Sequence, residues 1–333
     1  MRKIYLIAFL FSIKMTYSQS AFVKDEKKDI IEAVASVLED YYIGEEMSTK
    51  LKKSLLKNLK SGVYKNVTTR DAFAKLIEEQ CQEISKDKHI QLGFSPSKSD
   101  KNETKTNDNK KKHVGKYDPF ENFGFQRVRI FEREKIGRVK IGVFMDKKEA
   151  RETIDKIFES FADMESIIID LRDCIGGEAE MVNYVMSYFL DAKPIKFSTV
   201  YNRNRDIKKD RFTLGLNRIP AEKRLLKQKL YILTSKSTFS GGEAFTYHLK
   251  HFKRATIVGE TTGGGANMCM PVGLEVEDEV TKSIIGKYEI LVPIIKLTNV
   301  ITGTNWEGVG VKPDIEVEAD DAWEKAFELA GSK

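Results

Sequence analysis

Short apolar runs typical of β-strands alternate with amphipathic helical stretches from Phe120 onward, and this alternation constrains the fold most strongly. The runs are VRIFE, IGRVKIGVF, SIIIDL, LYILTS and ATIVGE, and the helical stretches cover 147–163, 177–190 and 241–252. Such alternation favours an α/β core with both faces of its sheet covered. Later runs, MPVGLEVE and YEILVPIIKLT, predict a β-hairpin or ribbon, and a final helix is expected near 321–330. We therefore expect an α/β core over residues 117–333.

The segment before this core is predicted to be helical. In DIIEAVASVLEDYY and DAFAKLIEEQCQEI the apolar residues recur at spacings of three and four, as an amphipathic helix requires. Residues 26–95 therefore predict a small helical bundle, within an N-terminal subdomain over 21–96. The next segment, SKSDKNETKTNDNKKKH, has no large apolar residue, so residues 97–116 are expected to form a flexible linker.

The first twenty residues have the order of a secretory signal peptide. Two basic residues precede the apolar run 4–13, and small or polar residues follow, with a cleavage site expected after Ser18. The alternative is a buried first helix or strand. The run is too short to span a bilayer as a helix, so we expect signal peptide 1–18 to be removed and the product to be periplasmic or extracellular, with no integral membrane segment.

Composition excludes several classes of protein. Three cysteines in 333 residues cannot form a disulfide framework, and no pairing among them can be deduced. The formal charge of +6 falls by three when Arg2, Lys3 and Lys14 leave with the signal peptide, so nothing indicates nucleic-acid binding. Isolated cysteines and the lack of a paired-histidine motif indicate no metal site and no cofactor.

Three predicted strands end in glycine-bearing turns. In IIIDLRDCIGGEAEMV (167–182), Gly176 and Gly177 open a helix whose free N–H groups suit an anion, although glycine there also suits a tight turn. In LYILTSKSTFSGGEAFTYHLK (230–250), Ser240 is either a nucleophile at the positive end of the helix dipole or simply the helix N-cap. VGETTGGGANM (258–268) matches neither a phosphate loop nor a dinucleotide fingerprint.

A serine nucleophile needs a base and a group that orients this base. The chain has four histidines, His89, His113, His248 and His251. His248 and His251 lie on the helix that follows Ser240, about two and three turns away, so they cannot reach the Ser240 hydroxyl. His113 lies in the hydrophilic segment. His89 remains, although a lone histidine is usually structural or exposed to solvent. Glu307 lies in the glycine-rich loop TGTNWEGVGVKPDIEV, which either fixes a carboxylate or is only a turn.

Together these segments resemble the C-terminal processing (tail-specific) serine peptidases, and more closely the branch with the tricorn core protease and the interphotoreceptor retinoid-binding protein repeats. The matching motifs are DLRDCIGG (170–177), TSKSTFSGGE (234–243), VGETTGGGA (258–266) and TGTNWEGVGVKPD (302–314), in the family's order. The resemblance covers roughly residues 85–318. It implies a crotonase/ClpP-like α/β core with an N-terminal helical subdomain, and no stretch has the pattern of a PDZ domain.

The resemblance also implies roles for single residues. Ser240 matches the nucleophile, His89 in Asp87-Lys88-His89 matches the general base, and Glu307 matches the carboxylate that completes the constellation. The family's other branch uses a lysine base in the loop after G-E-x-T, and here that loop has no lysine.

The oxyanion hole of the family matches the N–H of Gly241 together with that of Gly177 or Gly176. Cys174 replaces the usual Asn of this turn, and Ile175 is bulkier than most residues found there. Lys88, next to the base, is placed either to lower its pKa or to contact its carboxylate partner.

We therefore expect an exported serine endopeptidase that cleaves unfolded or C-terminal peptide segments through an acyl-enzyme. Two alternatives stay open, an inactive family member that binds an apolar ligand or peptide, and an acyl-transfer enzyme with a non-peptide substrate. The nucleophile and oxyanion hole are shared by peptide and ester hydrolysis, so the residues themselves do not separate these chemistries.

Overall fold

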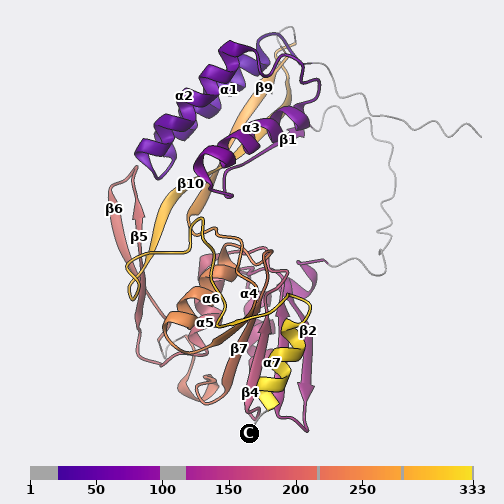
Figure 1. The fold of residues 1–333 in the computed structure, drawn as a ribbon, viewed down its shortest axis with the longest axis vertical. Helices are drawn as coiled ribbons and strands as arrows, with labels where there is room; N and C mark the ends of the chain where they lie inside the picture. Colours follow the sequence, from indigo (N-terminus) through magenta and orange to yellow (C-terminus); the bar gives the residue numbers. More distant parts are fainter. Residues whose placement is uncertain (1–21, 98–117, 216–217, 279–280, 332–333) are drawn as a thin grey trace, which may run out of the picture.

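The molecule consists of two layered parts stacked along its long axis (Figure 1). The computed structural model describes residues 22–97, 118–215, 218–278 and 281–331. The expected signal peptide (1–18), and the expected linker (97–116) apart from its first residue, lie outside the described residues. The helices are α1 (Glu26–Tyr41), α2 (Glu45–Ser61), α3 (Arg70–Ser85), α4 (Lys148–Ser160), α5 (Ala179–Ser187), α6 (Gly241–His251) and α7 (Ala322–Gly331), with short 3-10 turns at η2 (Glu121–Gly124) and η3 (Ala221–Lys223).

The lower part in Figure 1 is built on a six-stranded sheet with the order β11-β8-β7-β4-β3-β2. Its strands are β2 (Phe125–Phe131), β3 (Ile136–Ile141), β4 (Ser166–Asp170), β7 (Lys229–Thr234), β8 (Thr256–Gly259) and β11 (Ile315–Glu316). All neighbours run parallel except β2 and β3. Each strand that the sequence predicted here is present, and helices follow β3, β4 and β7 as expected.

Both faces of this sheet are covered. Successive side chains of a strand point to opposite faces, so Ile167 and Ile169 of β4 pack with α4, α5 and α6, while Ile168 packs with α7. The near-continuous apolar runs of the sequence follow from this two-sided burial. Because β4 and β7 are parallel neighbours, the glycine-bearing turns after them meet at the same edge of the sheet.

The second sheet is antiparallel and links the two parts. It has the order β1-β10-β5-β6, with β9 also paired to β10, and its strands are β1 (Gln91–Pro96), β5 (Lys196–Asn202), β6 (Ile207–Phe212), β9 (Met268–Glu277) and β10 (Ile284–Asn299). The predicted β-ribbon is thus confirmed as β9 and β10. The sequence did not indicate β5 and β6.

The N-terminal helices are not a free-standing bundle, and the prediction of helix over 26–95 is wrong at its end. Residues 91–96 form β1, which pairs with β10. The apolar faces of α1, α2 and α3 pack on the sheet through Tyr288, Ile290 and Val292 of β10. A buried ion pair between Arg70 and Glu26 (2.7 Å) ties α3 to α1, and the Tyr288 hydroxyl donates to Glu26 (3.1 Å). The helices and the ribbon thus share one hydrophobic core.

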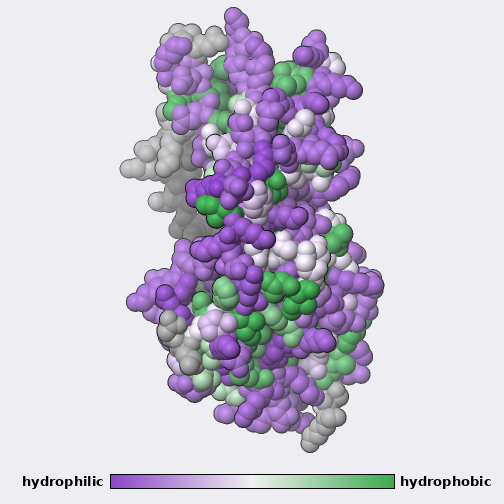
Figure 2. Space-filling view, turned by 90° about the vertical axis from the view of Figure 1, so that its left-hand side faces the viewer, coloured by the Kyte–Doolittle hydropathy of each residue, from purple (hydrophilic) through white to green (hydrophobic). Residues whose placement is uncertain are grey.

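The surface is mostly hydrophilic on the face seen in Figure 2, where apolar residues gather in patches over the α/β part. Within the part of the chain that the structure describes, no helix combines the length and the apolar character needed to cross a membrane.

Candidate active site

Ser240 lies at the turn between β7 and α6, at the N-cap position of the helix. Its backbone has φ 47° and ψ −112°, a conformation that costs a non-glycine residue free energy. The surroundings hold it there, because the Ser240 N–H donates to the carboxylate of buried Glu243 (2.9 Å). The residue lies at the edge of the sheet where the two glycine turns meet, and it also forms a capping box with Glu243, so its position fits both alternatives that the sequence left open.

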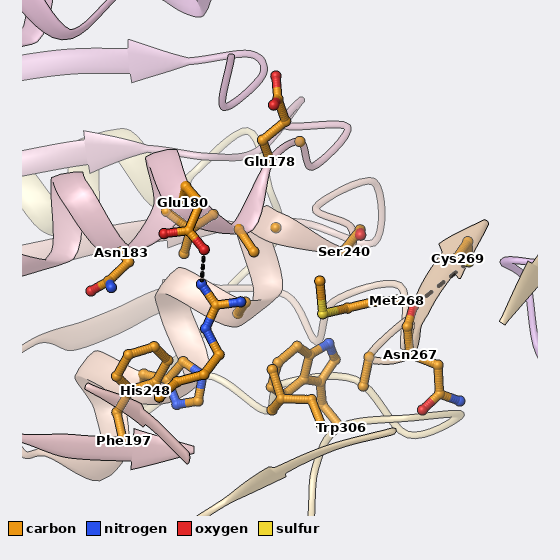
Figure 3. Close-up of a pocket in the computed structure, with 18 of the residues that line it drawn as sticks. Glu178, Glu180, Asn183, Phe197, Ser240, His248, Asn267, Met268, Cys269 and Trp306 are labelled. Atoms are coloured by element: carbon orange, nitrogen blue, oxygen red, sulfur yellow. Dashed lines mark hydrogen bonds and ion pairs between the residues drawn. The ribbon is translucent and has the colours of Figure 1, made fainter. Parts of the chain in front are cut away.

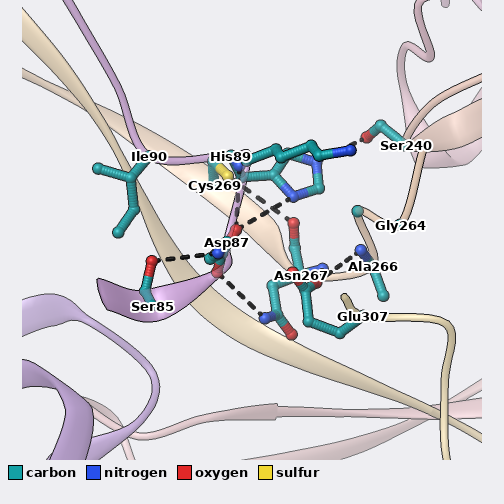
Figure 4. A network of polar contacts seen from close by, with 12 residues as sticks. Ser85, Asp87, His89, Ile90, Ser240, Gly264, Ala266, Asn267, Cys269 and Glu307 are labelled. Carbon is teal, nitrogen blue, oxygen red and sulfur yellow. Dashed lines mark hydrogen bonds and ion pairs between the residues drawn. The ribbon is translucent and has the colours of Figure 1, made fainter. Parts of the chain in front are cut away.

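His89 reaches Ser240 from the other part of the molecule. Its Nε2 lies 3.1 Å from the Ser240 Oγ, although 151 residues separate the two in sequence (Figure 4). His89 follows the end of α3, where the Asp87 carboxylate accepts the His89 backbone N–H (3.0 Å) and fixes the turn. The ring packs against Phe239, with centroids 4.7 Å apart. The predicted nucleophile and base are therefore brought within hydrogen-bond distance.

Burial favours the neutral form of the His89 imidazole. Its pKa is lowered because burial disfavours the charged ring, and the negative charge of Asp87 offsets this only in part. A neutral imidazole with Nε2 facing a hydroxyl is able to accept the hydroxyl proton, which a protonated ring is not.

Two carboxylates lie behind the ring. Glu307 accepts the N–H groups of Ala266 (2.7 Å) and Asn267 (3.0 Å) through one oxygen. Asp87, His89 and Glu307 each have one atom able to bind a metal, and these three atoms all lie within 4.8 Å of one another. Burial, and next the charge of Asp87, raise the pKa of Glu307 to about 7. The structure thus places the predicted Glu307 beside the base, and it adds Asp87 as a second carboxylate.

Asp87 is held by groups whose role the sequence did not reveal. Its Oδ2 accepts the Tyr42 hydroxyl (3.2 Å) and lies 3.5 Å from the Asn267 amide nitrogen. The spacing of Asp87 two residues before His89 was the available signal, since a carboxylate at this position suits a turn that hydrogen-bonds its own backbone. Tyr42 and Asn267 gave no such signal, because they come from distant segments.

The predicted oxyanion donors meet next to Ser240. A Cβ on Gly176 would lie 2.7 Å from the Ser240 Cβ, and a Cβ on Gly241 would lie 3.1 Å from the Gly177 nitrogen. Gly176 and Gly177 have φ of 109° and 125°, which favours glycine. Among the described residues, neither the Gly177 nor the Gly241 N–H has a backbone acceptor. Two donors are therefore free beside the hydroxyl, as an oxyanion hole requires.

Glu243 organises the third glycine loop, which the sequence left without a role. Its carboxylate accepts the Gly264 N–H (2.6 Å), the Gly265 N–H (2.8 Å) and the Thr262 hydroxyl (2.5 Å). This loop packs against His89, because a Cβ on Gly265 would lie 2.6 Å from the His89 Cε1. Lys88 does not act on the base or its carboxylates as anticipated, since its ammonium donates to the Gly263 carbonyl (2.8 Å).

A cavity of about 430 Å³ adjoins Ser240 and His89 (Figure 3). Apolar side chains from α6, β5, β10 and the loop after β10 form much of its wall, including Ala244, Phe197, Leu297 and Trp306. Buried His248 also lines it, and burial lowers the pKa of this ring to about 3. The cavity suits a bulky apolar side chain next to the nucleophile.

The other histidines and the three cysteines have no assigned role in catalysis. His251 packs against Tyr247 with ring centroids 4.3 Å apart, and His113 lies outside the described residues. Cys81, Cys174 and Cys269 are free thiols, and burial raises the pKa of Cys81 and of Cys174 to about 12. Cys174 contacts the start of α6, since a Cβ on Gly242 would lie 3.0 Å from the Cys174 sulfur. The thiol therefore packs at the position that Asn usually occupies in the family.

Comparisons with known proteins agree with this geometry. The family model described as peptidase family S41 matches residues 135–317, and the N-terminal domain of peptidase S41 in eukaryotic IRBP matches residues 21–123. A candidate peptidase from Parabacteroides merdae is 19% identical, with a TM-score of 0.62 over 92% of this chain and 97% of that chain.

Two further solved structures share the fold. The photosystem II D1 C-terminal processing protease is 13% identical, with a TM-score of 0.52 over 93% of this chain and 98% of that chain. The tricorn protease is also 13% identical, with a TM-score of 0.57 over 92% of this chain and 36% of that chain. At these identities the structures bear on the fold alone. The catalytic-domain match itself spans more than half of the sequence, and the chain therefore belongs to the serine peptidases of family S41.

Proposed function

We propose that the protein is an exported endopeptidase that cleaves unfolded or C-terminal peptide segments through an acyl-enzyme on Ser240. The observation that carries this proposal is the 3.1 Å contact between the Ser240 Oγ and the His89 Nε2. A binding protein for apolar ligands has no need of this contact. Ser240 therefore acts as nucleophile and His89 as general base.

Acylation proceeds in two proton transfers. As the Ser240 Oγ attacks the scissile carbonyl carbon, its proton passes to the His89 Nε2, and the carbonyl oxygen becomes an oxyanion that accepts the N–H groups of Gly177 and Gly241. His89 then gives the proton to the leaving amine, and the acyl-enzyme forms. Water deacylates it by the same route, with His89 again as base.

The carboxylates behind the ring stabilise the imidazolium of the intermediate. The Oδ1 of Asp87 lies 3.7 Å from Nδ1, and Glu307 belongs to the same cluster, so a positive ring gains attraction that the neutral ring lacks. General-base assistance typically contributes about 10²–10⁴-fold, and each oxyanion donor about 2.7–4 kcal/mol. An extended, unfolded substrate fits this site because the backbone must approach the glycine N–H groups closely.

The test is hydrolysis of an unfolded protein and of a mixed peptide library. We expect Ser240→Ala and His89→Ala each to lose about 10⁴-fold or more of the activity while staying folded, and His251→Gln to retain it. If only Ser240→Ala is inactive, the base is wrongly assigned. If the wild type cleaves no peptide, the binding of an apolar ligand or peptide becomes the better function. Export is tested separately, by finding that the protein recovered outside the cytoplasm begins at Gln19.

A further inference from the structure

Two buried polar atoms at the active site have no hydrogen-bond partner among the described residues. They are the Nδ1 of His89 and the Oε1 of Glu307, and both residues belong with Asp87 to one cluster whose ligand atoms lie within 4.8 Å of one another. The Oδ1 of Asp87 lies 3.7 Å from Nδ1, which is too long for a hydrogen bond. His89 is 7% exposed and Asp87 is 1% exposed. Such unpaired buried groups are rare, and a bound ion is one physical explanation for them.

The spacing of these atoms fits a small cation. Ligands about 2.1 Å from a tetrahedral Zn²⁺ lie about 3.4 Å from one another. Here the ligand atoms lie within 4.8 Å of one another, so shifts of about 1 Å suffice to bring them to coordination distance. One imidazole with two carboxylates suits Zn²⁺, whereas Mg²⁺ and Ca²⁺ prefer oxygen ligands alone.

We propose that Asp87, His89 and Glu307 bind Zn²⁺ and that the bound ion inhibits the peptidase. With both carboxyl groups ionised, Asp87 and Glu307 balance the charge of the ion. When Nδ1 coordinates a metal, the neutral ring carries its proton on Nε2. Nε2 then donates to the Ser240 hydroxyl instead of accepting its proton, and the base is lost. The inhibition rests on the proposed function, whereas the binding does not.

Binding is tested by calorimetric titration of Ser240→Ala with ZnCl₂, because this variant retains all three ligands and cannot digest itself. We expect one ion per chain. Asp87→Asn and Glu307→Gln, each added to Ser240→Ala, keep the shape of the side chain and should weaken binding at least about 10-fold, since even residues behind a ligand contribute 10–100-fold. His251→Gln is the matched control and should leave binding unchanged. Thermal denaturation without metal verifies that each variant is folded.

The proposal is overturned if no binding is detected, or if binding survives both carboxylate substitutions. Loss of binding with His251→Gln would place the ion at the surface and overturn it as well. Inhibition is tested on the wild type, whose hydrolysis should fall with Zn²⁺ and return with a chelator. If Zn²⁺ binds through the three residues but hydrolysis is unaffected, the inhibitory role is wrong. If the wild type does not hydrolyse peptides at all, the proposed function fails, and the titration alone decides the metal site.

Discussion

A single methyl group placed on Gly265 should disable the base by displacing the His89 ring from Ser240. The Cβ of Gly265→Ala would lie 2.6 Å from the Cε1 of His89 and 2.4–2.5 Å from two ring carbons of Phe239. Ordinary contacts begin at 3.4 Å, so the rings must give way by about 1 Å. Cε1 adjoins Nε2 in the ring, and the 3.1 Å contact with Ser240 is lost with it.

The expected cost follows from this displacement. A misplacement of about 1 Å in a catalytic group costs about 10²-fold in rate, and overpacking costs about 1–3 kcal/mol of stability. We therefore expect Gly265→Ala to lower kcat about 100-fold with little change in KM, because none of the three nearest contacts of the new methyl group belongs to the apolar wall of the cavity. The assay is hydrolysis of a fluorogenic peptide in the presence of a chelator, with thermal denaturation to verify folding.

Two matched variants separate the effect on His89 from general strain. Gly263→Ala also meets Phe239, at 2.8 Å, but no atom of His89 within its nearest contacts. Gly273→Ala in β9 has its nearest atom at 4.0 Å. We expect a smaller loss of kcat for the first and none for the second. Full activity of a folded Gly265→Ala would refute the assigned position of the base, and an equal loss in Gly263→Ala would show that strain at Phe239 is the cause.

Three further predictions concern other parts of the molecule. Gly176→Ala, whose Cβ would lie 2.7 Å from the Ser240 Cβ at a backbone φ of 109°, should lower kcat at least about 10²-fold in the same assay, and unchanged kcat would argue against this turn as part of the oxyanion hole. Arg70→Met leaves the buried Glu26 carboxylate without its cation, so chemical denaturation of the variant should show about 3–5 kcal/mol less stability, and a loss below 1 kcal/mol would contradict the burial of this pair. His248 has a pKa of about 3 in the folded protein and about 6.5 in the unfolded chain, so between these values only the unfolded chain takes up the proton. The free energy of unfolding should therefore fall as the pH drops from 6.5 towards 3. In His248→Gln this fall should be shallower, which denaturation at each pH will measure.

The local pattern of the sequence determined the strands and helices of the α/β core and the turn that presents Ser240. These features depend on periodic burial and on glycine, and both act over a few neighbouring residues. The pattern of 167–170 therefore predicts a buried strand correctly, and Gly176-Gly177 marks a turn correctly. The same local reasoning did not show that 91–96 is a strand, because β1 exists through its pairing with β10.

Only the tertiary structure decided which distant groups form the site. From the residues alone His89 was one histidine among four, and its role was implied by resemblance. The structure brings it to Ser240 by packing the N-terminal helices on a ribbon, β9 and β10, that comes from the end of the chain. Asp87 and Glu307 meet behind the ring in the same way, so no local spacing predicted that these residues form a cluster. The physical reason is that the alternation of buried and exposed positions can be read from neighbouring residues, whereas contacts between distant residues depend on how whole helices and strands pack.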